Sequence, residues 1–106
     1  MNAPLEKGHT PTDTFAFEPL SVAGTAAAFT SATEDPSDGQ PAISATFQVQ
    51  VAQIRYRLDG TNPTAAVGVL ADVGDEVVIW GRRDIQSFRA IRTGGVSATL
   101  ATHYAR

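Results

Sequence analysis

The segment 54–64 (IRYRLDGTNPT) constrains the fold of this chain more than any other. As far as Leu58 its apolar residues occupy every second position, with arginines between them, which is the two-residue period of a β-strand with one buried face. Asp59-Gly60 and Asn62-Pro63 then follow, and both pairs are typical of tight turns. The segment therefore predicts a strand that ends in a turn, and its pattern is neither that of a helix nor that of a catalytic loop.

The longest extended stretch, residues 42–58, changes phase part-way along. Its large apolar residues stand at odd-numbered positions before Ala52-Gln53 and at even-numbered positions after it. Because a slip of one residue moves every side chain to the opposite face, we expect either a β-bulge here or a strand that passes from one sheet to another. No turn residue marks the place, which favours a bend within a continuous strand.

The rest of the chain consists of short runs separated by turn residues. We expect strands at residues 76–80, 85–91 and 96–104, a hairpin at Gly94-Gly95, turns at 72–75 and 81–84, and a loop at 31–40. The Ala-rich segment 20–29 favours a strand or a bent strand pair, with a short helix at 25–29 as the alternative. Seven or eight short strands and turns roughly every ten residues predict an all-β fold, an antiparallel β-sandwich or barrel.

A core for such a fold is expected to form around the largest apolar residues. The predicted core anchors are Phe47, Ile54, Tyr56, Trp80, Phe88, Leu100 and Tyr104. Residues 1–14 are polar and lack periodicity, so they predict a flexible N-terminal arm, followed by a single β domain at 15–106. The chain contains no cysteine, which excludes disulfides and Cys-ligated zinc.

Charge and hydropathy limit the classes of partner. The net charge is −3, and the basic excess of a nucleic-acid-binding domain is missing. No signal peptide is visible and no apolar stretch approaches the roughly 20 residues of a membrane span, so we expect a soluble protein made in the cytoplasm, with no membrane partner.

Six arginines of the second half form the candidate subunit-contact set, because arginine is enriched at protein interfaces. They are Arg55, Arg57, Arg82, Arg83, Arg89 and Arg92. The alternative is that these arginines lie on a solvated sheet face and form ion pairs between neighbouring strands. Only 18% of the residues are charged, against roughly 25% in an ordinary domain, which suits a surface partly covered by neighbouring subunits or one rich in Thr, Ser and Gln.

No constellation of catalytic or metal-binding residues stands out. His9 lies in the predicted arm and His103 in the last strand, and neither has a second ligand at metal-site spacing. The acids of residues 34–38 lack the spacing of an EF-hand, and no nucleophile elbow or phosphate-binding loop occurs. We therefore expect no metal, no cofactor and no enzymatic activity.

Four blocks of the chain, spread over roughly residues 20–106, resemble small structural proteins of tailed bacteriophages and related gene-transfer particles. The blocks are RYRLDGTNPTAAVG at 55–68, GDEVVIW at 74–80, FRAIR at 88–92 and ATLATHY at 98–104. The resemblance implies a virion component assembled in the host cytoplasm: a capsid decoration (cement) protein, or a head–tail connector or tail accessory protein. Its implied partners are the major capsid protein or other virion proteins, together with further copies of itself.

Two other functions remain open from the residues alone. A carbohydrate-binding module would place exposed Trp80 and Tyr56 on one sheet face. A small hydrolase would need His103 beside an acid and a nucleophile in one cleft.

Overall fold

The computed structural model describes residues 13–37 and 39–106. This part of the chain forms seven strands and two short helices: β1 (Thr14–Val22), α1 (Ser31–Glu34), β2 (Ser44–Gln50), β3 (Ile54–Arg57), β4 (Val69–Ala71), β5 (Glu76–Trp80), α2 (Arg82–Ser87), β6 (Arg89–Arg92) and β7 (Ala98–Ala105). The all-β expectation is therefore confirmed.

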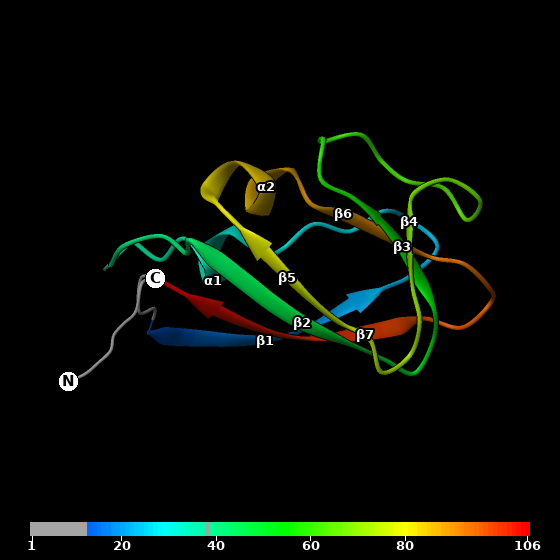
Figure 1. Ribbon diagram of the computed structural model, residues 1–106, viewed down its shortest axis with the longest axis horizontal. Helices are drawn as coiled ribbons and strands as arrows, with labels where there is room; N and C mark the ends of the chain where they lie inside the picture. The colour runs from blue at the N-terminus through cyan, green and yellow to red at the C-terminus, as the bar shows by residue number, and fades with distance from the viewer. Residues whose placement is uncertain (1–12, 38) are drawn as a thin grey trace.

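The strands form two antiparallel sheets that enclose one core (Figure 1). The first sheet has four strands in the order β1-β7-β2-β5, and the second has three in the order β4-β3-β6. Strand β7 lies between β1 and β2, so residues far apart in sequence are neighbours in the larger sheet. Asp13 and Arg106 also exchange backbone hydrogen bonds, of 2.9 and 3.0 Å.

The phase change at Ala52-Gln53 marks the passage from one sheet to the other. Strand β2 belongs to the four-stranded sheet and β3 to the three-stranded sheet, and residues 51–53 lie between them. Val51 has φ = 76°, a left-handed conformation that is rare for a β-branched residue. The sequence left open a β-bulge or a passage between sheets, and the passage between sheets is observed. The strand is interrupted at residues 51–53, whereas a bend within a continuous strand was expected.

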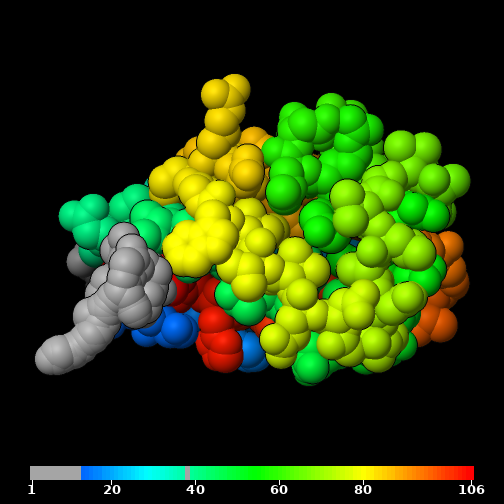
Figure 2. Space-filling view, viewed as in Figure 1, coloured from blue at the N-terminus to red at the C-terminus, as the bar shows by residue number. Residues whose placement is uncertain are grey.

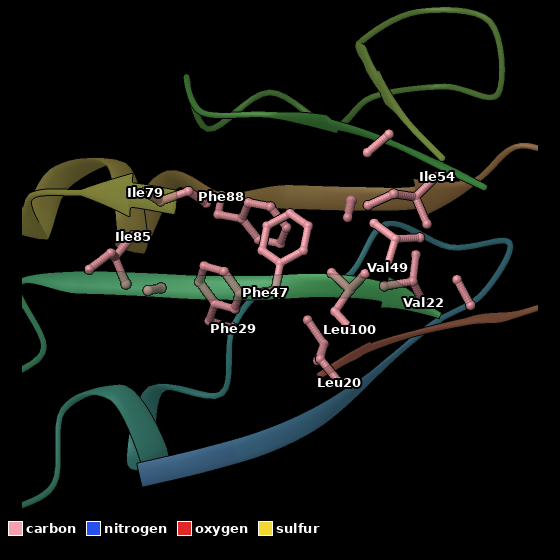
Figure 3. Packing of buried hydrophobic residues seen from close by; sticks show 14 of the residues in the cluster. Leu20, Val22, Phe29, Phe47, Val49, Ile54, Ile79, Ile85, Phe88 and Leu100 are labelled. Carbon is pink, nitrogen blue, oxygen red and sulfur yellow. The ribbon is translucent and has the colours of Figure 1, made fainter. Parts of the chain in front are cut away.

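The core between the sheets is centred on aromatic rings (Figure 3). Phe88 stacks on Phe29 with ring centroids 4.1 Å apart, and Phe47 lies 5.5 Å from Phe88. Ile54, Leu100 and Tyr104 are fully buried, and Tyr56 is half-buried against the same cluster. The assignment of Trp80 to the core is wrong: its side chain is 57% exposed, because β5 is an edge strand whose even-numbered side chains point away from the second sheet.

Several local expectations also require correction. Residues 82–87 form helix α2, where a turn and the start of a strand were expected, and this helix buries Ile85. Gly94-Gly95 joins β6 to β7 in the other sheet and is therefore not a hairpin turn. Segment 25–29 forms no helix, so the alternative of a short helix there is wrong; Ala27 forms an isolated bridge with Ala90. Helix α1 forms within the expected loop 31–40.

The expected arm, residues 1–14, lies mostly outside the described residues. Residues 1–12 are not described, whereas Asp13 pairs with Arg106 and Thr14 begins β1. The ordered domain therefore begins at least two residues before the expected boundary.

The core contains one buried phenol that hydrogen-bonds to a carboxylate. The Tyr104 hydroxyl donates to Glu18 Oε1 at 2.6 Å, and Tyr104 is fully buried. Burial, followed by the hydrogen bond to Glu18 and its negative charge, raises the pKa of Tyr104 far above the ordinary tyrosine value of about 10. The neutral phenol is therefore part of the folded state even in alkaline solution.

This phenol is expected to make the fold sensitive to alkali. Because the folded-state pKa is raised, the stabilisation is complete below the unfolded-state pKa near 10 and is lost as the pH rises above it. Above pH 10 each such phenol should lower the free energy of unfolding by about 1.4 kcal/mol per pH unit. Denaturant titrations between pH 9 and 11 should show a shallower alkaline decline for Tyr104→Phe than for the unchanged chain; equal slopes would contradict the assignment.

Candidate interaction surface

Arg55 and Arg57, the first of the candidate contact residues, hold the loop that follows β3. Arg55 donates from Nε to the carbonyl of Ala65 at 3.1 Å and from Nη1 to the carbonyl of Gly68 at 2.9 Å. Arg57 donates from Nε to Asp59 Oδ1 at 3.0 Å, and this hydrogen bond lowers the pKa of the Asp59 carboxyl. Arg57 thus holds the start of the turn that was predicted after this strand, and Arg55 holds the far end of the loop.

Arg82 forms the most buried ion pair of the described residues. Its Nη1 donates to Glu34 Oε1 at 2.9 Å and to the carbonyl of Ala42 at 3.2 Å. The Glu34 side chain is only 4% exposed, so the charge of Arg82 compensates a carboxylate that water barely reaches. The pair ties α2 to α1.

Of the remaining three candidate arginines, two make hydrogen bonds within the chain and one is exposed. Arg89 Nη1 donates to the carbonyls of Gln86 and Phe88, and Arg92 Nη1 donates to Ser97 Oγ at 3.3 Å. Arg83 is exposed on α2. Five of the six arginines therefore make hydrogen bonds within the chain, and a role of the set in subunit contact stays a prediction.

A different surface stands out in the structure: the outer face of the four-stranded sheet, here called the open face. One row of side chains crosses all four strands, because Phe17 pairs with His103, His103 with Thr46, and Thr46 with Val78. The Phe17 ring lies 5.0 Å from the His103 ring. Figure 2 shows β5 in yellow, β7 in red and β1 in blue reaching the surface on this side.

The open face has few charges and carries three large apolar side chains that are exposed to water. Phe17, Val78 and Trp80 are 53%, 52% and 57% exposed. Sheets with one solvated face ordinarily alternate apolar side chains inward with polar side chains outward. On this face the outward positions of the four strands carry one carboxylate, Glu76, and no lysine or arginine. These exposed apolar groups make the open face a candidate interaction surface.

The structure does not bring a catalytic set together around His103. This histidine stands on the open face between Phe17 and Thr46, and not in a cleft. A hollow of about 370 Å³ lies elsewhere, between α1 and α2, and is lined in part by Phe29, Glu34 and Arg89. Within residues 13–37 and 39–106, no group of three or more His, Asp or Glu side chains is arranged to hold a metal ion.

The two rings of the carbohydrate alternative do not share a face. Trp80 belongs to β5 of the four-stranded sheet, and Tyr56 belongs to β3 of the other sheet. Tyr56 turns inward, 6.0 Å from Phe47 and 5.9 Å from Phe88. The platform of two aromatic rings that this function required is therefore not present.

Sequence reasoning missed Phe17 and Val78 as surface residues. The run EVVIW at 76–80 looks like a strand buried on both faces, but its even-numbered side chains lie on the outer face of the four-stranded sheet, which no other described segment covers. For β1 a signal existed: Pro19 cannot donate a ladder hydrogen bond, which favours an edge strand.

The described helices contain none that is both long and apolar enough to cross a membrane. Comparison of the chain with protein-family models, with curated proteins and with solved structures gave no match.

Proposed function

We propose that this protein is a non-enzymatic structural component of a virus-like particle, and that it binds to the particle through the open face. The observation that carries the proposal is the row Phe17–His103–Thr46–Val78, with Trp80 beside it, on a sheet face that bears large exposed apolar groups and one carboxylate. The resemblance of residues 20–106 to structural proteins of tailed phages supports the choice of partner. The particular role we propose is capsid decoration, with the major capsid protein as the surface that is bound.

The mechanism of such a protein is mechanical. A rigid sheet face that packs against an assembled shell gains its free energy from the burial of apolar surface, at roughly 25 cal/mol per Å² before the costs of association. A protein that binds the assembled shell and not its dissociated subunits stabilises the shell by mass action. Many symmetry-related copies act together, so that modest affinity at each site is sufficient.

Binding to particles tests the proposal directly. Purified protein is mixed with assembled heads of the phage or gene-transfer particle that encodes it and is then sedimented. We expect saturable binding at a fixed ratio to the major capsid protein. The double variant Phe17→Ser/Trp80→Ser is expected to bind at least about 30-fold more weakly, since truncation of two aromatic interface anchors costs about 2 kcal/mol or more.

A matched control separates the open face from exposed apolar groups in general. Val67 and Val73 are 52% and 57% exposed but lie in loops outside the four-stranded sheet. The variant Val67→Ser/Val73→Ser should bind heads as the unchanged chain does. Equal loss in both double variants would count against the open face, and binding to necks or tails without binding to heads would reject the decoration role.

A further inference from the structure

Within residues 13–37 and 39–106, strand β5 is a sheet edge that no proline, bulge or covering strand protects against pairing with another strand, and Glu76 is its one charged residue. Natural edge strands are shielded by shortness, proline, bulges, charge or a covering segment. Strand β1, the opposite edge, carries Pro19 and a bulge between Thr14 and Ala16. In the second sheet β4 has only three residues, and β6 is covered by Ala27, which exchanges two backbone hydrogen bonds with Ala90.

At alternate residues of β5, the backbone hydrogen-bonding groups have no strand partner among the described residues. Two hydrogen bonds at the ends of β5 show which of its residues direct their backbone groups toward β2. Val49 N–H donates to the Asp75 carbonyl at 3.0 Å, and Gly81 N–H donates to the Ile43 carbonyl at 2.7 Å. Asp75 and Gly81 therefore face β2, and by alternation so do the two odd-numbered residues between them. The N–H and C=O groups of Glu76, Val78 and Trp80 consequently point away from the sheet.

These outward groups are complementary to a second copy of themselves. If two β5 strands run antiparallel about a two-fold axis at Val78, Val78 faces Val78 of the second copy, and Glu76 faces Trp80 of the second copy. Each facing pair consists of outward residues on both sides, so each can exchange both of its backbone hydrogen bonds. No like charges meet, because Glu76 is the one charged residue of the strand.

We infer that this chain forms a two-fold symmetric dimer through antiparallel pairing of β5 with β5 of a second copy. The two four-stranded sheets then become one sheet of eight strands. The pairing uses the backbone edge, so the side chains of Phe17, Val78 and Trp80 remain on the outer face of the joined sheet. The contact is short, and the dimer is therefore expected to dissociate on dilution. The inference does not depend on the proposed function.

A single introduced cysteine tests the predicted register. The chain has no cysteine of its own, so a cross-link can form only at the new position. In the dimer the two copies of residue 78 lie about 5.5 Å apart at Cα, within the range that a disulfide bridges. Val78→Cys should therefore oxidise to a covalent dimer under mild conditions. Val73→Cys, equally exposed but about 30 Å from its counterpart in this register, should remain monomeric in a denaturing gel.

A second pair of variants tests the edge without covalent chemistry. Val78→Pro removes only an N–H that β2 does not use, so the fold should be retained, whereas the dimer dissociation constant should rise at least tenfold. Val78→Thr keeps the N–H and should dimerise as the unchanged chain does. Sedimentation equilibrium over a range of concentrations measures both, with circular dichroism to confirm folding.

Three results would overturn the inference. The first is a mass equal to the monomer at every concentration, together with Val78→Cys cross-linking no faster than Val73→Cys. The second is a dimer that Val78→Pro leaves intact, because the contact would then lie elsewhere. The third is a trimer or larger ring, which a two-fold axis cannot produce. These measurements use no particles. The dimer inference can therefore be rejected while particle binding is observed, and particle binding can be rejected while the dimer is observed.

Discussion

Replacement of Phe88 by alanine is expected to lower the free energy of unfolding by about 4 kcal/mol. Phe88 is fully buried and stacks on Phe29 at 4.1 Å, with Phe47 at 5.5 Å and Tyr56 at 5.9 Å. Its removal leaves a cavity at the point where both sheets and the segment before α1 meet, and the surrounding rings cannot all close over it. Since small domains are stable by only about 5–15 kcal/mol, urea titration should find this variant close to unfolding at 25 °C.

The same substitution on the open face is the matched control. Phe17 is 53% exposed, so Phe17→Ala removes an equal number of atoms without a buried cavity. Its effect on the free energy of unfolding should stay within about 1 kcal/mol. If the two variants unfolded at similar urea concentrations, the aromatic cluster would not be the centre of the core.

Replacement of Arg82 by methionine is expected to cost about 3 kcal/mol, the lower end of the range for breaking a buried ion pair. The lower end is appropriate because the Arg82 side chain is 27% exposed. The loss comes chiefly from Glu34, whose nearly buried carboxylate would no longer have its 2.9 Å partner. The free energy of unfolding from denaturant titration at pH 7 measures the effect.

Two further variants decide whether the pair is the cause. Arg83→Met makes the same change one residue along α2 at an exposed position, and its effect should be within about 0.5 kcal/mol. The double variant Glu34→Met/Arg82→Met should be more stable than Arg82→Met alone, since no buried unpaired carboxylate remains. Asp35, which lies 3.7 Å from Arg82, also loses this partner, but it does so in both variants and its side chain is half exposed to water. A double variant less stable than the single one would show that Arg82 acts through packing instead.

Local signals predicted those parts of the fold that are determined locally. Strand β3 and the turn after it were read from alternation and from Asp59-Gly60, and Gly60 has φ = 80° as such a turn requires. In β7 the even-numbered side chains from Ala98 to Tyr104 are buried, in agreement with the alternation in the sequence. In both elements the alternation and the turn residues that gave the prediction lie within a few positions of one another in the sequence.

The errors concern features that depend on distant neighbours. The apolar run of β5 suits a strand covered on both faces, so the sequence did not show that the outer face, with Trp80 on it, is uncovered by the other described residues. Gly94-Gly95 has hairpin chemistry, but the strands on its two sides belong to different sheets. Helix α2 has only six residues, too few for a helical period to appear, and Ile85 suits a strand equally well.

The candidate surface was predicted less well than the fold. Residue chemistry favoured the arginines, and the structure shows that five of them hold loops, α1 or strand ends within the chain. The open face is assembled from β1, β7, β2 and β5, whose order in the sheet is not their order in the sequence. A surface that exists only after these strands have paired leaves no local pattern to recognise.

The place of β7 in the larger sheet has a consequence for synthesis. Residues 98–105 are translated after all the other strands, yet they lie between β1 and β2 and are the partner of both. Until they leave the ribosome, β1 has no neighbour in its sheet and β2 has only β5. Strand β1 must therefore stay unpaired, or bound to a chaperone, for most of translation. A chain built in this way completes its fold in one late step, and premature termination before residue 98 should yield a product for proteolysis and not a smaller domain.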